Sequence, residues 1–350
     1  MINNKLYLII IIMKYKIIET LGSGVVGTTY KVEINKKYYA LKINKISHED
    51  ATKISKANKN ITSDVLDLQV LREIFFAKRM NSVPNHLMKI YKYKIKKNCK
   101  HIQPFHLYRN QDKDVDNWMN ELDKSKYCIE YVLDLKDGIL YNIIDQLTSN
   151  QIYSMVIQIT YAIYLMHSKE FYHCDIHSEN IAYVKTDIEY LNIFDYQIPT
   201  FGYIYSLIDY GAIRSREFKF RDDDIKFFEH PINKLRDNYR FISSTMTHKL
   251  FKYMEKNNIQ FNEFKKNVIN TNEFNQLFLQ YPLNSFDSIL PLLHSSYPDV
   301  VLNLIGIDQN YSKYNEFSKC YLTKDQVLYF LTNIDNPTKI VAYFYNLLDM

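Results

Sequence analysis

The sequence predicts an α+β protein in which a smaller, mostly antiparallel β part precedes a larger, mostly helical part. Thr28 to Ile34 and Lys37 to Ile43 are rich in β-branched and aromatic residues and are separated by a polar turn at Asn35-Lys36. From Ser149 onward, apolar residues recur at the spacing of an amphipathic helix. The chain has 350 residues, of which 47% are hydrophobic, so it can bury a sizeable core.

The composition excludes some classes of partner and site. The formal net charge of +5 is too small to indicate nucleic-acid binding without a clustered basic patch. The four cysteines lack C-x-x-C spacing, which disfavours a structural zinc site or a dense disulfide framework, and the simpler interpretation is a reducing intracellular compartment. The cysteines are Cys99, Cys128, Cys174 and Cys320.

Residues 1–12 are interpreted as an apolar N-terminal extension. The run from Leu6 to Met13 is about half the length of roughly 18 residues that a membrane span requires. No cleavage site of small residues follows it. An extra strand, or an upstream start before Met13, is therefore preferred to a signal peptide or anchor, which remains the alternative.

Three of the seven glycines, Gly22, Gly24 and Gly27, have G-x-G-x-x-G spacing. This spacing occurs where a dinucleotide-binding fold opens a helix and also where a β-hairpin covers nucleotide phosphates. Because the segment that follows is strand-like, the hairpin is preferred, and its backbone amides can approach phosphate oxygens. We assign the following residues of this region to nucleotide binding: Leu21, Gly22, Ser23, Gly24, Gly27, Thr29 and Ala40.

Lys42 follows on the next predicted strand, where it can neutralise the α and β phosphates; a solubilising lysine on an edge strand is the alternative. A helix is predicted over Asp64 to Met80, with Ser63 as its N-cap. Glu73 lies in the apolar stripe of this helix, where an unpaired charge would be costly. Glu73 is therefore the expected partner of Lys42. The alternatives are a Glu73 paired with a basic residue of its own helix, and Glu49.

The strand Tyr127 to Val132 runs into a polar stretch, which is typical of a junction between two parts of a chain. Its backbone is expected to bind adenine, so Glu130 and Val132 are assigned to the nucleotide site. An ordinary strand-end role is the alternative for Glu130. The predicted division is 13–132 and 133–350. Another strand is expected near Met88 to Lys94, followed by a polar, inserted loop.

The run from His173 to Asn180 carries the candidate chemistry. Phosphoryl transfer needs a carboxylate that receives a hydroxyl proton and an amide oxygen that binds a metal ion. Asp175 and Asn180 have these side chains at the required spacing. The same residue types also cap helices and stabilise turns, so the run depends on its context.

A second metal ligand is expected on a strand after Asn180. Asp195 is nearer in sequence, but Asp209 follows an apolar strand and precedes Gly211, which permits a sharp turn. Asp209 and Asn180 are therefore the predicted Mg²⁺ ligands. Residues 185–205 then form a β-type excursion with a turn at Pro199 to Gly202.

The order of these elements resembles the eukaryotic-type protein kinase superfamily over nearly the whole chain. The resemblance is closest to haspin-like atypical kinases and to serine/threonine kinases of large DNA viruses. This narrower resemblance rests on His177, Ile198 to Gly202, and Asp237 to Arg240. It implies the two-lobed protein kinase fold, with ATP and Mg²⁺ as cofactors.

The resemblance also implies an activity and a setting. The expected enzyme is an atypical serine/threonine protein kinase that transfers the γ-phosphoryl group of ATP to protein hydroxyls. It would be a monomer without a membrane span, located in the cytoplasm or nucleus, or in a host cell or virion if viral. The implied catalytic residues are Asp175, Lys42, Glu73 and His177.

Departures from the family pattern keep two alternatives open. Cys174 stands where most protein kinases have arginine, His177 replaces the usual lysine, and no Ala-Pro-Glu follows Gly211. Asp237 is a candidate anchor of the larger lobe. A pseudokinase that acts as a binding module is one alternative. The other is a small-molecule phosphotransferase of the aminoglycoside or choline kinase type, which shares a histidine two residues after the catalytic aspartate.

Overall fold

The structure is a computed structural model. It describes residues 14–24, 27–56, 69–80, 86–99, 120, 122, 124–218, 237–238, 241, 329, 333 and 336–348. The predictions for residues 1–12, for the start of the helix at 63–68 and for most of 241–350 lie outside these residues. The described part is α+β, as predicted, and every strand pair in its sheets is antiparallel.

The chain divides into two compact units. The first comprises 1–82, 88–136 and 217–219, and the second comprises 83–87, 137–216 and 220–350. The main division thus falls after Lys136, whereas the sequence prediction placed it after Val132.

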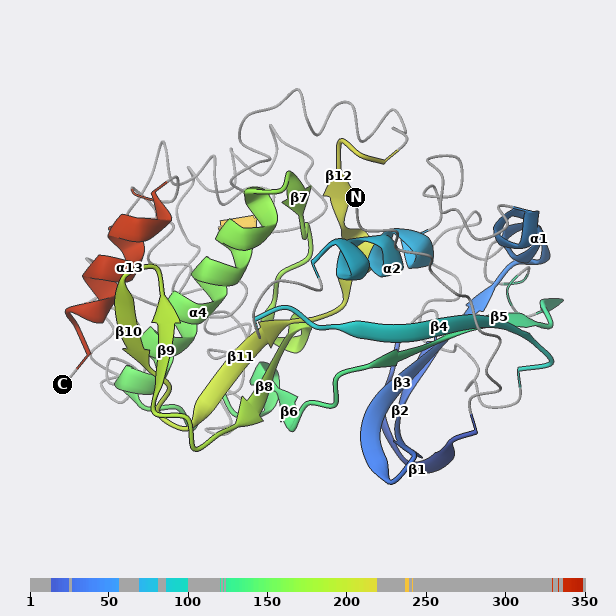
Figure 1. The fold of residues 1–350 in the computed structure, drawn as a ribbon, viewed down its shortest axis with the longest axis horizontal. Helices are drawn as coiled ribbons and strands as arrows, with labels where there is room; N and C mark the ends of the chain where they lie inside the picture. Colours follow the sequence, from blue (N-terminus) through green and yellow to red (C-terminus); the bar gives the residue numbers. More distant parts are fainter. Residues whose placement is uncertain are drawn as a thin grey trace, which may run out of the picture. The chain divides into compact units, whose positions relative to one another are not determined.

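A five-stranded antiparallel sheet forms the centre of the first unit (Figure 1). In spatial order its strands are β1 (Lys16–Ser23), β2 (Gly27–Ile34), β3 (Lys37–Ile46), β5 (Tyr127–Leu133) and β4 (Ile90–Lys97). Two helices, α1 (His48–Lys56) and α2 (Gln69–Arg79), belong to the same unit.

The predicted hairpin between β2 and β3 is present. Its turn residues Asn35 and Lys36 both have positive φ, at 51° and 64°. Two successive positive φ angles match the right-handed twist of the flanking strands in a tight hairpin, and asparagine tolerates this conformation better than most residues. The strand β4 begins at Ile90 rather than Met88 and extends to Lys97.

The two faces of the sheet carry different kinds of side chain. One face carries an apolar cluster that includes Leu41, Ile43 and Val132. Lys42 lies between Leu41 and Ile43 along β3, so its side chain points to the opposite face. Its direct partner across the β3–β5 pair is Tyr131, which shares that face. The helix α2 contacts this second face through Glu73.

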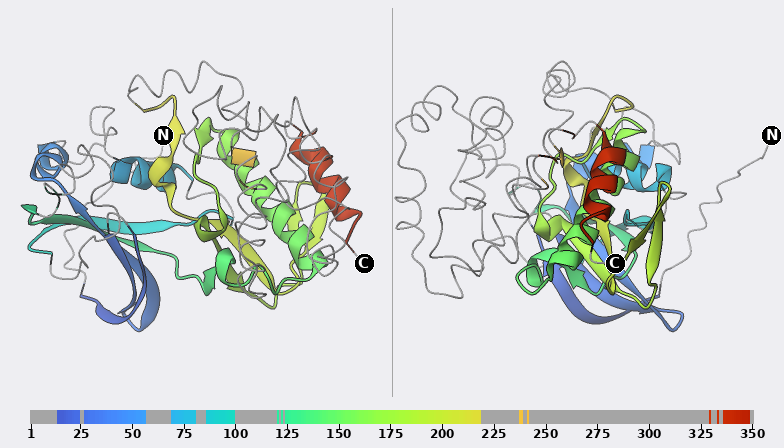
Figure 2. Two further views of the ribbon diagram at one scale, coloured as in Figure 1. Left: turned by 180° about the vertical axis from the view of Figure 1, so that it is seen from behind. Right: turned by 90° about the vertical axis from the view of Figure 1, so that its left-hand side faces the viewer.

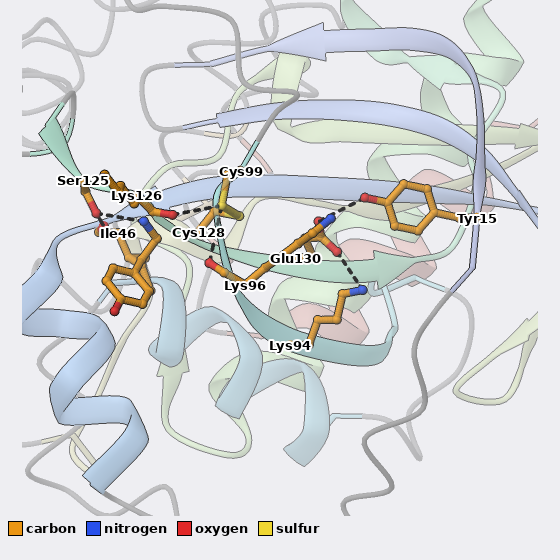
Figure 3. Close-up of a disulfide and its surroundings, with 10 residues drawn as sticks. Tyr15, Ile46, Lys94, Lys96, Cys99, Ser125, Lys126, Cys128 and Glu130 are labelled. Atoms are coloured by element: carbon orange, nitrogen blue, oxygen red, sulfur yellow. Dashed lines mark hydrogen bonds and ion pairs between the residues drawn. A yellow bond between two sulfur atoms is a disulfide. The ribbon is translucent and has the colours of Figure 1, made fainter.

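A disulfide between Cys99 and Cys128 closes the base of the loop between β4 and β5 (Figure 3). The two Cα atoms are 6.0 Å apart, a normal span for a disulfide. The cysteine spacing gave no indication of this pair, because 29 residues separate the two cysteines and their proximity depends on strand pairing. Cys174 is buried and outside any disulfide, and Cys320 lies outside the described residues.

The helix α4 (Ser149–His167) is the longer of the two helices that the structure describes in the second unit. Thr148 is its N-cap, and the Thr148 and Gln151 side chains form a capping box with the backbone. The helix begins where the apolar pattern predicted. The following residues of that pattern are all buried, which confirms their predicted place in the core: Ile152, Met155, Val156, Ile159, Ile163 and Met166. The helix α13 (Pro337–Tyr345) packs against α4 (Figure 2).

Short antiparallel strands also belong to the second unit. In the part that the structure describes they form three sheets, in the orders β11-β8-β6, β10-β9 and β12-β7. Their bounds are β6 (Gly138–Ile139), β7 (Phe171–Tyr172), β8 (Ile181–Lys185), β9 (Tyr190–Ile193), β10 (Tyr196–Pro199), β11 (Tyr203–Leu207) and β12 (Arg214–Ser215). Short 3₁₀ turns lie at Leu140–Asn142, Ser178–Asn180 and Tyr210–Ala212.

The predicted excursion before Asp209 is a β-hairpin, β9–β10, inserted between β8 and β11. It has one turn at Phe194-Asp195 and leads into a second turn at 200–202, where Phe201 and Gly202 have positive φ. Among the helices that the structure describes, none has both the length and the apolar character needed to cross a bilayer.

Replacing Gly27 should destabilise the first unit. A Cβ atom at this position would overlap the carbonyl oxygen of Ile43 and the Asn44 side chain, so Gly27→Ala is expected to lower the free energy of unfolding by about 1 to 3 kcal/mol. Gly22→Ala is the matched control, because a Cβ there meets no heavy atom within 4 Å. Urea unfolding of both variants measures the difference, and equal stabilities would contradict the close approach at Gly27.

Reducing the disulfide should also lower stability. A cross-link that closes a loop of 29 residues restricts the unfolded chain and contributes about 3 to 4 kcal/mol in the loop-entropy estimate. Peptide mapping without reductant should recover a linked Cys99–Cys128 peptide, and reductant should lower the Tm of the wild type but not of Cys99→Ser. An equal response of both proteins to reductant would contradict the cross-link.

Candidate active site

The backbone of the predicted catalytic run is held by one buried carboxylate. Asp237 accepts hydrogen bonds from the backbone N–H groups of His173 and Cys174, each at 2.7 Å. His167, at the end of α4, lies 3.0 Å from the same carboxylate through Nε2. These hydrogen bonds, and above all the one to the His167 side chain, hold the pKa of Asp237 below its ordinary value even though burial acts to raise it.

This geometry explains the unusual backbone at Cys174, which has a positive φ of 64°. A non-glycine residue pays a steric cost in this region and keeps the conformation only where its surroundings impose it. The two hydrogen bonds to Asp237 on successive N–H groups provide that constraint. The sequence suggested Asp237 as an anchor, and the structure adds His167 as a side-chain partner of its carboxylate.

His173 connects the run to the segment that follows β11. Its Nε2 lies 3.0 Å from the carbonyl oxygen of Ile208, so Nε2 carries the proton and donates. The ring also contacts Tyr210 in an edge-on arrangement. Burial lowers the pKa of His173, and the carboxylates of Asp237, Asp175 and Asp209 act in the opposite direction with smaller effect. The charges of Asp175 and Asp209 thus both act on the pKa of this one buried histidine.

Asn180 ties Asp175 to the end of the run. Its Nδ2 donates to the Asp175 carbonyl oxygen at 2.9 Å and to Asp175 Oδ2 at 3.2 Å. Both partners are acceptors, which fixes the orientation of the amide and leaves its Oδ1 as the atom able to bind a metal. The Asp175 side chain is 40% exposed, so its carboxylate remains accessible.

His177 contacts the same amide. Its Nε2 lies 2.9 Å from Asn180 Nδ2 and 3.7 Å from Asp175 Oδ2. The His177 ring therefore packs against the Asn180 amide beside the Asp175 carboxylate. His177 thus contacts the amide of Asn180 from the position where the family pattern has lysine.

Sheet register places Asp209 at the same end of the β8–β11 pair as Asn180. Leu207 and Ile181 are direct partners, and Ile208 donates its N–H to the Asn180 carbonyl at 2.9 Å. Asp209 follows in a left-handed conformation, with φ 57°, and accepts from the Gly211 N–H. The rival Asp195 is an exposed residue in the turn of the separate β9–β10 hairpin. The arrangement therefore favours Asp209 as the partner of Asn180.

The first unit contains the predicted ion pair. Lys42 Nζ lies 3.4 Å from Glu73 Oε1, and the Glu73 side chain is 2% exposed. Glu49, the rival candidate, instead pairs with Lys53 on the exposed surface of α1. Lys42, Thr29 and Gly22 lie in one row across β3, β2 and β1, because each is the direct partner of the next.

The glycine hairpin is partly described. Gly24 donates its N–H to the Gly27 carbonyl at 2.8 Å, and residues 25 and 26 lie outside the described part. Leu21, Gly22, Ser23 and Gly24 are exposed, whereas Ala40 is buried on the same face of β3 as Lys42. The exposure of these four residues is compatible with the predicted phosphate contacts.

Glu130 and Val132 do not fit a contact with adenine through their backbone. They lie in the interior strand β5, which pairs with β3 on one side and with β4 on the other, so its backbone groups are used in the sheet. The Glu130 carboxylate is buried and is held by Lys94, Lys96 and the Tyr15 hydroxyl at 3.0 to 3.1 Å (Figure 3). Burial and this carboxylate raise the pKa of Tyr15. Glu130 therefore has a structural role.

Sequence reasoning missed Tyr131, which contacts the ion pair, and Asn44, which contacts Tyr131. Tyr131 donates its hydroxyl to Glu73 Oε2 at 2.7 Å, and Asn44 donates from Nδ2 to the Tyr131 oxygen at 3.0 Å. The one available signal was alternation along β5 and β3, which places both residues on the face of Lys42.

The donor set fits a magnesium ion that is held jointly with a ligand. Asp209 and Asn180 offer hard oxygen ligands, and Mg²⁺ commonly uses one or two protein carboxylates plus phosphate oxygens and water. Within the described ranges, no group of three or more His, Cys, Asp or Glu side chains could hold a metal ion. Neither a protein-family model nor a curated protein sequence matches this chain.

Acid should destabilise the wild type through His173. The pKa of the buried ring is below its ordinary value of about 6.5, so below that pH the unfolded chain binds a proton that the folded chain does not, and stability falls as pH falls. The difference in unfolding free energy between the wild type and His173→Gln should decline by up to about 1.4 kcal/mol per pH unit below about pH 6.5. Urea unfolding from pH 8 to pH 5 measures it, and parallel pH curves would contradict a neutral buried His173.

Proposed function

We propose that the chain is an ATP-dependent protein kinase that transfers the γ-phosphoryl group to serine or threonine hydroxyls. In this proposal the two units are the small and large lobes of a protein kinase fold. The observation that carries the proposal is the constellation of Asp175, Asn180 and Asp209 at one end of the β8–β11 pair. A carboxylate acceptor, an amide oxygen and a second carboxylate together suit metal-assisted phosphoryl transfer.

Asp175 is the proposed base. Its exposed carboxylate can accept a hydrogen bond from an acceptor hydroxyl and receive the proton as the oxygen attacks phosphorus. The hydrogen bond from Asn180 Nδ2 to Oδ2 fixes the carboxylate relative to the proposed metal ligands. Positioning of this kind supplies much of the acceleration in phosphoryl transfer, because the protein itself forms no covalent bond.

Asn180 Oδ1 and the Asp209 carboxylate are the proposed metal ligands. A bound Mg²⁺ would neutralise charge on the transferring phosphate. The left-handed backbone at Asp209 and the Gly211 N–H orient this carboxylate, and the Ile208–Asn180 hydrogen bond holds the two ligand-bearing segments together. These contacts are made within the protein, so they need no bound ligand.

Lys42 and the glycine hairpin are the proposed nucleotide-binding groups of the first unit. Glu73 gives Lys42 a fixed anion partner, which suits a cation that must meet phosphate oxygens in one place. We propose that the backbone of Leu135, just after the end of β5, contacts adenine in place of Glu130 and Val132. Leu135 is half-buried, and its backbone has no hydrogen-bond partner in the part of the chain that the structure describes.

The setting of the enzyme stays a prediction. A protein substrate and a monomeric state follow from the resemblance stated for the sequence. An intracellular location was inferred from cysteine spacing, but the Cys99–Cys128 disulfide weakens that inference, because disulfides persist mainly in oxidising surroundings. A virion, which forms inside a host cell and then leaves it, would be consistent with both the intracellular location and the disulfide.

Phosphoryl transfer should depend on Asp175 and Asp209 but not on Asp195. Purified protein is incubated with labelled ATP and Mg²⁺, with generic protein acceptors in one arm and small alcohols in another. Asp175→Asn should lower the rate by about 100- to 10,000-fold, the usual contribution of a positioned base. Asp209→Asn should abolish metal-dependent transfer, and Asp195→Asn, the exposed control, should leave the rate unchanged.

Each alternative has its own outcome in this experiment. Equal labelling by the wild type and Asp175→Asn would refute the enzyme and favour a pseudokinase. Labelling confined to small alcohols would refute a protein substrate and favour a small-molecule phosphotransferase. Loss of activity in Asp195→Asn but not in Asp209→Asn would refute Asp209 as the metal ligand and would favour Asp195, in the turn of the β9–β10 hairpin.

A further inference from the structure

Tyr131 occupies an unusual place among the polar residues of the first unit. Its side chain is fully buried, at 0% exposure, yet its hydroxyl donates to Glu73 Oε2 at 2.7 Å. The same oxygen accepts a hydrogen bond from Asn44 Nδ2 at 3.0 Å. A buried tyrosine hydroxyl that both donates and accepts is fixed in direction as well as position.

The two oxygens of Glu73 have different partners at different distances. Oε2 accepts from Tyr131 at 2.7 Å, whereas Oε1 lies 3.4 Å from Lys42 Nζ. A hydrogen bond from a hydroxyl to a carboxylate is short and strong, while 3.4 Å is long for a direct ammonium contact. The Tyr131 hydroxyl therefore lies closer to this carboxylate than the Lys42 ammonium does.

Strand pairing explains why the four residues meet. Lys42 and Tyr131 are direct partners across β3 and β5, and Asn44 follows Lys42 by two residues on the same face. The helix α2 then brings Glu73 onto that face. The Lys42 ammonium also lies 5.8 Å from the centre of the Tyr131 ring, within the range of a cation–π contact.

Asn44 extends the network toward the glycine hairpin. Its Oδ1 is buried and has no hydrogen-bond partner among the described residues. A Cβ atom at Gly27 would overlap this same oxygen. Gly27, Asn44, Tyr131 and Glu73 thus form a continuous path from the end of the glycine hairpin to the carboxylate that faces Lys42.

We propose that Tyr131 is a positioning residue that orients Glu73, and through it Lys42, for nucleotide binding, with Asn44 holding its hydroxyl. This inference rests on the proposed function. In this inference the neutral Tyr131 hydroxyl fixes the geometry of the ion pair. It holds Glu73 Oε2, while Oε1 remains directed at Lys42. The ammonium can then meet phosphate oxygens without losing its protein partner.

Tyr131→Phe removes one oxygen atom and keeps the ring. Since a hydrogen bond to a charged group is a strong one, kcat/KM for ATP should fall about tenfold or more. Tyr205→Phe is the matched control, because Tyr205 is also fully buried but its hydroxyl has no partner within the described ranges. It should change kcat/KM by less than about twofold.

A double-mutant cycle separates positioning from packing. In a Glu73→Ala background the Tyr131 hydroxyl has no carboxylate to orient, so adding Tyr131→Phe should change kcat/KM by less than about twofold. Additive effects of Tyr131→Phe and Glu73→Ala would show that the tyrosine acts through packing alone. A lowered Tm with kcat/KM equal to the wild type would overturn the proposal in the same way.

A second measurement needs no phosphoryl transfer. A lysine held in an ion pair reacts slowly with an amine-acylating ester, so mass spectrometry should find Lys42 acylated several-fold faster in Tyr131→Phe and unchanged in Tyr205→Phe. Unchanged Lys42 labelling in Tyr131→Phe refutes the positioning role. If labelling rises as expected but the wild type transfers no phosphate, the proposed function fails and the positioning role stands.

Discussion

The hydrogen bonds between the Asp237 carboxylate and the backbone of His173 and Cys174 are the constraint on which the candidate active site depends. They satisfy two buried N–H groups and impose the positive φ of Cys174. The turn at Cys174 lies immediately before Asp175, so the direction of the proposed base follows from it. His173, fixed by the same carboxylate, then reaches the Ile208 carbonyl and ties the run to the segment that carries Asp209.

Three buried carboxylates each have several hydrogen-bond or ion-pair partners, but the networks that they form differ in role. Glu73, Glu130 and Asp237 are each at most 1% exposed, and each has several donors, as a buried charge requires. Asp237 shapes a backbone and Glu73 faces a lysine beside the glycine hairpin. Glu130 joins the edge strand β4 to Tyr15 (Figure 3). Burial of a carboxylate therefore indicates a network, and only the partners show whether the network serves chemistry or the sheet.

The sequence predicted the parts of the molecule that depend on local pattern. The helix α4, the hairpin turn at Asn35-Lys36 and the pairing of Lys42 with Glu73 each follow from periodicity or from the cost of an unpaired charge. It could not predict the Cys99–Cys128 disulfide, the contact of Asp237 with the run, or the network at Glu130. These contacts join residues 29 to 115 positions apart, and their registers depend on sheet pairing that no local pattern specifies.

Residues can contact one another only when their side chains lie on the same face of the sheet. This explains why Glu130 and Tyr131, which are neighbours in β5, have different partners. Glu130 and Tyr131 are adjacent in sequence but point to opposite faces, because strand side chains alternate. Glu130 therefore meets Tyr15 and the lysines of β4, whereas Tyr131 meets Glu73 and lies beside Lys42. A prediction that treats the strand as a unit gives Glu130 and Tyr131 the same role. A prediction that follows the alternation from Lys42 across the β3–β5 register separates them and places Tyr131 on the face of Lys42, since direct partners share a face.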